Sequence, residues 1–68
     1  MKNWIVADKE HLGGAPRVRG TRISIAFLLE SLAAGMPISK IVQAYPTLTE
    51  ESVRGVLAEL AKEKQKAA

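Results

Sequence analysis

The chain has 68 residues, no cysteine and a single histidine, His11, which excludes a disulfide framework and a zinc site built from these ligands. Its apolar fraction of 47% is typical of a globular domain, and its length predicts one domain over residues 1–68. No apolar run approaches the roughly 20 residues of a membrane span. A charge follows too soon after the start for a signal peptide, so we expect a cytoplasmic protein without a membrane anchor.

The net charge of +3 originates in the N-terminal third of the chain. Residues 1–22 contain five of the ten basic residues and two of the seven acidic ones, whereas residues 23–48 and 49–68 are each balanced. A concentrated basic segment can attract phosphate or an acidic protein surface. The alternative is a solvated surface that keeps a small protein soluble.

Residues 3–22 are expected to form a β-prone basic arm. Short strands are predicted at 4–7 and 17–19, where Val18 faces one side and the flanking arginines face the other. Gly13 and Gly14 permit a sharp turn with positive φ between them. Two strands this short are not stable alone, so they must pack on helices or pair with a second chain.

Residues 24–65 are expected to form a trihelical part. Ser24 is a good N-cap for a first helix that ends at Gly35. A second helix is predicted near residues 38–45, where Pro46 stops it. Its start is ambiguous, because Pro37 can be a first-turn proline or Ser39 can be the cap.

The third helix has the clearest boundaries. Thr49 is its predicted N-cap, and Leu48 and Val53 are spaced for a hydrophobic staple. Helices of about ten, seven and fourteen residues with a three-residue link predict a mainly α, trihelical domain whose second and third helices form a helix-turn-helix pair.

Catalysis and cofactor binding are not expected. His11 is interpreted as an exposed loop residue rather than a general base, since no nucleophile motif lies near it. Gly13 and Gly14 are not followed by the Gly-Lys-Ser/Thr of a phosphate loop. The chain also lacks any metal-ligand spacing, so we expect neither an enzyme nor a cofactor.

Binding to nucleic acid is the stronger chemical prediction. A helix-turn-helix reads DNA with the start of its second helix, which here offers Ser52 and Arg54. The preceding Glu50 and Glu51 repel phosphate, although capping at a helix start also explains them.

The arginines of the basic arm are better phosphate candidates. We expect Arg17, Arg19 and Arg22 to supply the basic contact surface, with Thr21 positioned by Gly20. The alternative for these arginines is an exposed edge with surface ion pairs. The single tryptophan, Trp4, is interpreted as a core plug, with an interface anchor as the alternative.

One stretch of the arm carries a family resemblance: Gly13-Gly14-Ala15-Pro16-Arg17-Val18-Arg19-Gly20-Thr21-Arg22-Ile23. Downstream the chain has Leu32-Ala33-Ala34-Gly35-Met36, then Tyr45-Pro46, then Leu48-Thr49. In this order the motifs resemble the bacterial domain-of-unknown-function family numbered 433, over residues 3–61. Val18 replaces the usual isoleucine, and Pro37 stands where the family commonly has a serine cap.

The resemblance implies a homeodomain-like helix-turn-helix fold. It also implies a role as the antitoxin of a bacterial type II toxin–antitoxin pair. The implied partners are a PIN-type ribonuclease toxin, which it neutralises, and its own operator DNA. We expect a homodimer, because the core is small and the strands are short. Two other hypotheses remain open: a stand-alone helix-turn-helix regulator that reads DNA through Ser52 and Arg54, and an interaction domain whose hairpin adds a strand to a partner sheet.

Overall fold

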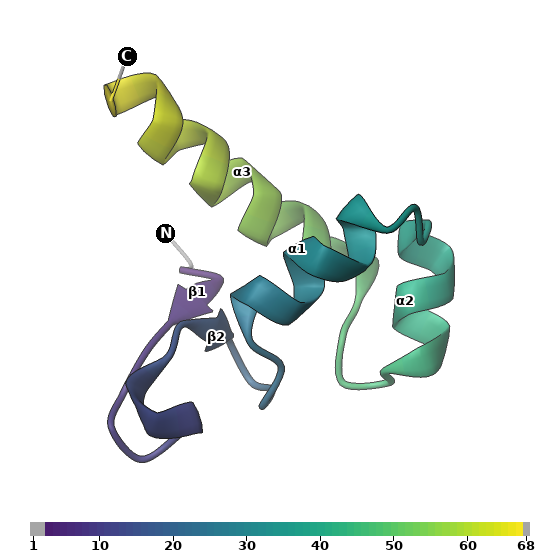
Figure 1. Cartoon of the computed structure of the whole chain (residues 1–68), viewed down its shortest axis with the longest axis horizontal. Helices are drawn as coiled ribbons and strands as arrows, with labels where there is room; N and C mark the ends of the chain where they lie inside the picture. Colours follow the sequence, from purple (N-terminus) through teal and green to yellow (C-terminus); the bar gives the residue numbers. More distant parts are fainter. Residues whose placement is uncertain (1–2, 68) are drawn as a thin grey trace.

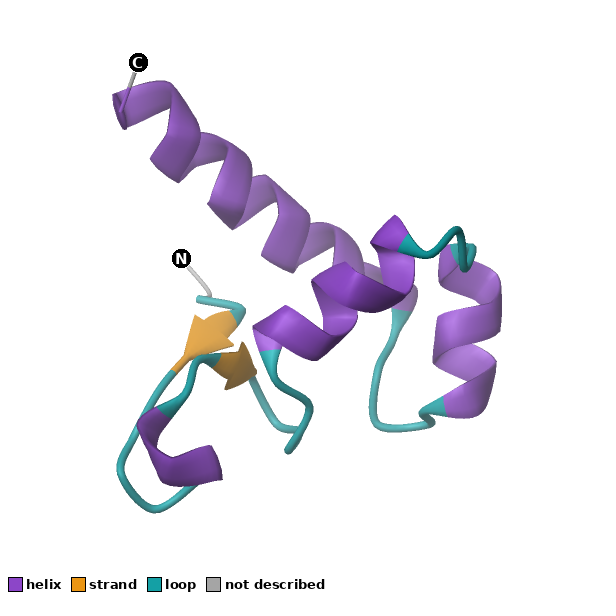
Figure 2. Ribbon diagram, viewed as in Figure 1, coloured by secondary structure: helices purple, strands orange, loops and turns teal. Residues whose placement is uncertain are grey.

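The computed structural model describes residues 3–67, with side chains described through residue 64. A two-stranded N-terminal hairpin precedes three helices, as predicted (Figures 1 and 2). The elements in chain order are β1 (Ile5–Val6), a 3-10 turn (Leu12–Gly14), β2 (Arg17–Val18), α1 (Ile25–Ala33), α2 (Ile38–Ala44) and α3 (Glu50–Ala67). The fold is therefore mainly α, with α2 and α3 as the helix-turn-helix pair.

The hairpin pairs within the chain. β1 and β2 are antiparallel, with Ile5 opposite Val18. On its other side, β2 contacts the segment that leads into α1, where the N–H of Val18 donates to the carbonyl of Ile23 at 2.9 Å. Gly13 and Gly14 have φ of 62° and 92°, which confirms the predicted turn between the strands. These strands need no second copy to complete their pairing.

The caps of α1 agree with the prediction and the start of α2 does not. Ser24 accepts a hydrogen bond from the N–H of Phe27 at 3.0 Å, and Gly35 follows the helix at a φ of 96°. At α2 both alternatives are wrong, Pro37 as a first-turn residue by one position and Ser39 as the cap by two. Pro37 occupies the N-cap itself with an extended ψ of 154°, and Ser39 lies inside the helix. Proline suits this cap because the position needs no N–H donor.

α3 is longer than predicted, with 18 residues, and it extends past the expected boundary at 65. Its start is a reciprocal capping box. The N–H of Ser52 donates to Thr49 Oγ1, and the N–H of Thr49 donates to Ser52 Oγ, each at 3.0 Å. Leu48 and Val53 are both buried on either side of this cap, as the predicted staple requires.

The hairpin is part of the hydrophobic core. Val18 of β2 is completely buried, and β2 contacts both α1 and α3. The buried apolar residues come from every helix as well as from β2: Val18, Ile25, Leu28, Ile41, Leu48, Val53 and Val56. The basic arm therefore packs against the helices as part of the domain.

The N-terminal strand is fastened to α3. Glu59 accepts hydrogen bonds from the N–H groups of Trp4 and Ile5, the latter at 3.3 Å. The indole of Trp4 lies against Gly55, where a Cβ would stand only 2.6 Å from Trp4 Cγ. Trp4 packs on the core, in agreement with its interpretation as a core plug.

Candidate nucleic-acid interface

Arg17 is fixed by its neighbours at the base of the hairpin. One terminal nitrogen of its guanidinium lies 2.9 Å from Asp8 Oδ2, and the other donates to the carbonyl of Thr21 at 3.5 Å. Its side chain is only 11% exposed. The Nε of Arg17 is buried and has no acceptor among the residues that the structure describes. Arg17 thus forms an ion pair, as the alternative interpretation expected, but its side chain is largely buried and does not lie at an exposed edge.

Asp8 organises this corner electrostatically. Its carboxylate lies 2.7 Å from Nδ1 of His11 and also pairs with Arg17. The hydrogen bond from His11, followed by that from Arg17, holds the pKa of Asp8 below its usual range. Asp8 therefore remains ionised at neutral pH and offsets the charge of Arg17.

Thr21 shapes the turn after β2. Its hydroxyl donates to the carbonyl of Val18 at 2.8 Å and accepts from the N–H of Ile23 at 3.0 Å. The residue is 8% exposed, so its predicted part in the contact surface is indirect. Gly20 precedes it with a φ of 78°, which fits the expectation that this glycine positions Thr21.

The other two arginines of the arm are exposed. Arg19 donates from Nε to the carbonyl of Asn3. Within residues 3–67, Arg22 has no hydrogen-bond or ion-pair partner, and it sits on the tip of the turn that Thr21 holds. The excess positive charge of this corner therefore comes from Arg22 and Arg19.

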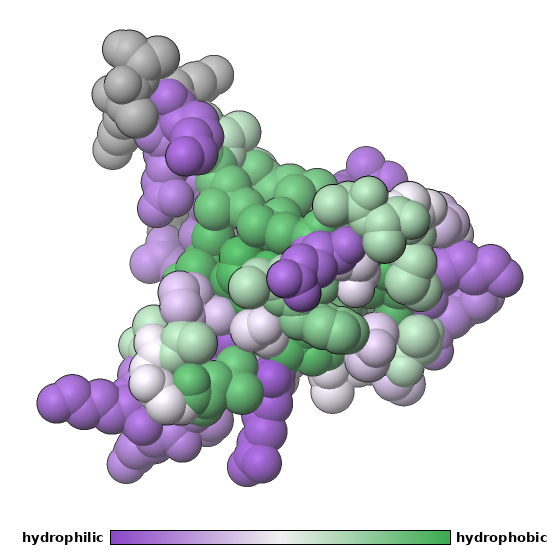
Figure 3. Space-filling view, viewed as in Figure 1, coloured by the Kyte–Doolittle hydropathy of each residue, from purple (hydrophilic) through white to green (hydrophobic). Residues whose placement is uncertain are grey.

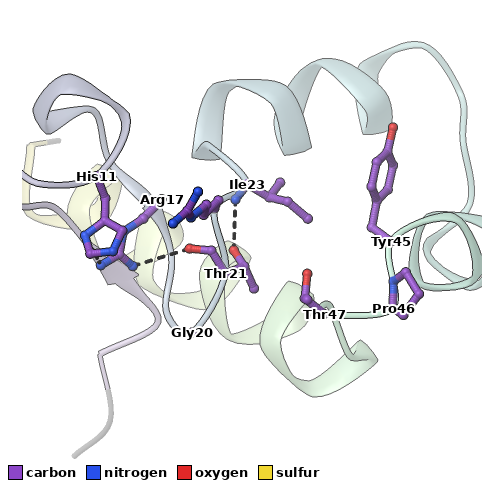
Figure 4. Close-up of a pocket in the computed structure, with 9 residues that line it drawn as sticks. His11, Arg17, Gly20, Thr21, Ile23, Tyr45, Pro46 and Thr47 are labelled. Atoms are coloured by element: carbon purple, nitrogen blue, oxygen red, sulfur yellow. Dashed lines mark hydrogen bonds between the residues drawn. The ribbon is translucent and has the colours of Figure 1, made fainter.

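A groove of about 650 Å³ opens beside this turn (Figure 4). One wall carries His11, Arg17 and the turn from Gly20 to Ile23, and the other is the α2–α3 link. The link contributes Tyr45, Pro46 and Thr47. We call this space the arginine groove.

The first turn of α3 provides fewer side chains for DNA contact than the sequence predicts. Ser52 is 4% exposed, and its hydroxyl is used in the capping box, where it also donates to the carbonyl of Thr49 at 2.9 Å. Its hydroxyl is therefore not available for the base contact assigned to it from the sequence. Arg54 is exposed, and its guanidinium lies 3.5 Å from Glu50 on the same face of the helix.

A second hollow, of about 380 Å³, is apolar and lies between the hairpin, α1 and α3. Ile5, Pro16, Leu29 and Leu60 line it, with Glu63 at its rim. Hydrophobic residues gather along α3 in the space-filling view (Figure 3). We call this space the apolar hollow, and it shares no lining residue with the arginine groove.

Several groove residues lacked a functional signal in the sequence. Tyr45 and Pro46 were interpreted as the end of a helix and as part of the family motif, and His11 only as a loop residue. They meet because the hairpin folds onto the helix-turn-helix, and no spacing in the sequence encodes that approach.

The described part of the chain has neither a metal-ligand cluster nor a membrane-spanning helix. Among the described residues, no three His, Cys, Asp or Glu side chains cluster so that they could hold a metal ion. No helix within residues 3–67 is both long and apolar enough to cross a membrane.

The chain matches a family model described as "Protein of unknown function (DUF433)" over residues 5–59. The chain belongs to the DUF433 family. This match spans the hairpin, α1, α2 and the part of α3 up to Glu59, and so includes the whole lining of the arginine groove. The resemblance seen in the arm and the helix ends is therefore confirmed as family membership.

This DUF433 chain is also similar in sequence to a curated protein. It is "Uncharacterized protein y4eO" of Sinorhizobium fredii (strain NBRC 101917 / NGR234), 36% identical over 50 residues. The aligned region is 74% of this chain and 23% of that protein, so the chain spans about a quarter of the relative's length. No solved structure matches the chain.

Proposed function

We propose that this DUF433 protein is a non-enzymatic binding module, the antitoxin of a bacterial type II toxin–antitoxin pair. In this proposal it neutralises a PIN-type ribonuclease toxin and binds its own operator DNA. The observation that carries the proposal is the presence of two unlike surfaces with no residue in common, the arginine groove and the apolar hollow. Such a pair suits a module with one polyanionic and one protein partner.

We assign DNA to the arginine side. Arg19 and Arg22 are exposed cations on a rigid turn, and phosphate is the group that such cations attract. The start of α3, by contrast, pairs its one arginine with Glu50. Contacts to the DNA backbone are expected to dominate affinity.

Salt titration of operator binding tests this assignment. Replacing Arg19 and Arg22 together by Gln should weaken binding and reduce the slope of log K against log salt by about two. The matched control is Lys40→Gln with Lys64→Gln, which removes the same charge from exposed positions elsewhere on the molecule. An unchanged affinity and slope in the Arg19/Arg22 variant would refute the assignment.

We assign the toxin to the apolar hollow. Protein interfaces have apolar cores, and this hollow presents Leu29 at 37% exposure beside Ile5 and Leu60. Leu29→Glu should abolish co-purification with the toxin. It should also abolish inhibition of the toxin's ribonuclease activity, while DNA binding persists. Met36 has the same 37% exposure and lies outside the hollow, so Met36→Glu is the control. Equal loss in both variants would contradict the assignment.

We also propose a homodimer. A 68-residue chain has a small core, and large apolar side chains remain 37–43% exposed at Leu12, Phe27, Leu29 and Met36. Sedimentation equilibrium at micromolar concentration should give twice the 7.4 kDa of one chain. A single species at the monomer mass would overturn this part alone.

A stand-alone DNA-binding regulator is the second candidate, because Arg54 is exposed on α3 of the helix-turn-helix pair. It predicts that Arg54→Gln relaxes base preference by about 1–3 kcal/mol at one position, with no toxin in complex. A strand-adding interaction domain is less well supported, since the N–H of Ile5 on β1 is already bound by Glu59.

A further inference from the structure

We propose that the arginine groove holds one phosphate of a nucleic-acid backbone, with the attached nucleoside lying toward the α2–α3 link. This inference deepens the DNA-binding part of the proposed function by naming the site and the group that it takes. It does not depend on the toxin.

The positive end of the groove is organised before any ligand arrives. Arg17 is held by Asp8 and by the carbonyl of Thr21, so its guanidinium loses little freedom on binding. Because Asp8 offsets the charge of Arg17, the excess positive charge at the groove comes from Arg22. The Nε of Arg17 is buried and has no acceptor among the described residues, so it stays within the wall and the donors for a phosphate come from Arg22.

The turn that carries Arg22 is also rigid. Thr21 fastens it with two hydrogen bonds, and Gly20 supplies the positive φ that the turn needs. Arg22 therefore extends from a fixed backbone and remains free to reach a phosphate oxygen. A guanidinium can donate two parallel hydrogen bonds to such a group.

The opposite end of the groove is suited to a nucleoside. Tyr45 and Pro46 give it an apolar wall, and Thr47 presents a hydroxyl toward the space (Figure 4). The ring of Tyr45 is held edge-to-face by Phe27, with centroids 5.3 Å apart. An aromatic wall beside arginines is a combination that accepts bases and sugars next to their phosphates.

The size of the groove favours a nucleotide unit over a carboxylate side chain. At about 650 Å³ it is far larger than one carboxylate needs, and it falls within the range of sites for small organic ligands. The phosphate can come from a nucleic-acid backbone or from a free nucleotide. We choose the backbone because exposed Arg19 extends the positive surface beyond the groove.

The test is a titration of the ¹⁵N-labelled full chain at low salt, in which NMR records the chemical shifts of the backbone amides. Separate samples receive a short DNA duplex, AMP, inorganic phosphate or a polyglutamate peptide. Three variants accompany the natural protein: Arg22→Gln and Thr47→Val in the groove, and Lys40→Gln as the control. The control removes the same charge from an exposed position of α2 that does not line the groove.

The duplex should shift the amides of Gly20, Thr21, Arg22 and Thr47. Arg22→Gln should weaken duplex binding about tenfold, as expected for loss of a charge-assisted hydrogen bond. Thr47→Val should weaken it by a smaller factor, and Lys40→Gln should change it by no more than the general loss of one charge. AMP that shifts the same amides while the duplex does not would support the phosphate site with a free nucleotide as its source.

Other outcomes overturn the inference. If the duplex binds but Arg22→Gln and Lys40→Gln have equal effects, the groove is not the phosphate site, although the DNA-binding proposal stands. If neither duplex nor AMP nor phosphate shifts the groove amides, both the inference and the DNA assignment fail. Binding of polyglutamate in preference to the duplex would replace the phosphate with an acidic protein segment and refute the inference.

Discussion

Replacing Gly55 by alanine is expected to destabilise this protein, although the same change stabilises most helices. Gly55 lies within α3, where an added methyl group ordinarily gains about 1 kcal/mol in helix propensity. Here the new Cβ would overlap Cδ1 and Nε1 of Trp4 and would stand 2.6 Å from its Cγ. The indole would have to move.

The magnitude follows from the opposing contributions. Overpacking of this kind typically costs about 1–3 kcal/mol. Trp4 cannot retreat freely, because the N–H of its own backbone is bound by Glu59. Because the overlap is severe and Trp4 is fastened, the cost falls in the upper part of this range, about 2–3 kcal/mol, and subtracting the propensity gain of about 1 kcal/mol leaves a net destabilisation of about 1–2 kcal/mol. For a domain of this length that corresponds to a fall in melting temperature of roughly 5–15 °C.

A double-mutant cycle with Trp4→Ala isolates the contact. Urea unfolding of the four proteins is followed by far-ultraviolet circular dichroism, with sucrose added equally to all if Trp4→Ala alone is too unstable. Without the indole, Gly55→Ala should stabilise by about 1 kcal/mol, which gives a coupling energy of about 2–3 kcal/mol. If Gly55→Ala raises the stability of the natural chain, the close contact between Trp4 and α3 does not exist and the reasoning fails.

Two further predictions concern a cap and a charge. Ser52→Ala should cost about 1 kcal/mol in urea unfolding because it removes half of the capping box, whereas Ser39→Ala inside α2 should be neutral or slightly stabilising; equal effects would contradict the capping role. The lowered pKa of Asp8, caused first by His11 and then by Arg17, means that its contribution to stability is complete above its ordinary pKa near 4 and is lost as the pH falls through the lowered value. Acid titration should therefore loosen the Asp8 loop in the natural chain, and Asp8→Asn should lack this acid-dependent step when amide exchange is followed by NMR.

Local signals in the sequence predicted most of the fold. Ser24, Thr49 and Gly35 mark helix ends through their own chemistry, and the structure confirms all three. Pro37 was misplaced by one residue, because proline fits both the cap and the first turn by the same criterion of needing no donor. The residue type alone therefore does not determine whether Pro37 is the N-cap or the first residue of the helix.

The candidate site was less predictable, because it depends on contacts between distant residues. Ser52 is a residue type that contacts bases from a recognition helix, but here its hydroxyl donates a hydrogen bond to the carbonyl of Thr49. Arg17 belongs to a basic run in the sequence, yet its partner Asp8 lies across the hairpin turn. Tyr45 and Thr47 become groove residues only because the hairpin packs against the helices.

The anchoring of the hairpin has a consequence for binding. A basic arm that is disordered before it meets its partner must lose conformational entropy on binding, and this loss reduces its affinity. Here Val18 is in the core, Thr21 is bonded to its own turn, and Trp4 is fastened to α3. The arginines are thus presented by a turn that is already ordered, so most of the ordering cost is met during folding. Stability and anion binding should therefore be coupled in this domain: variants that release Trp4 from α3 are expected to weaken duplex binding, although Trp4 lines neither surface.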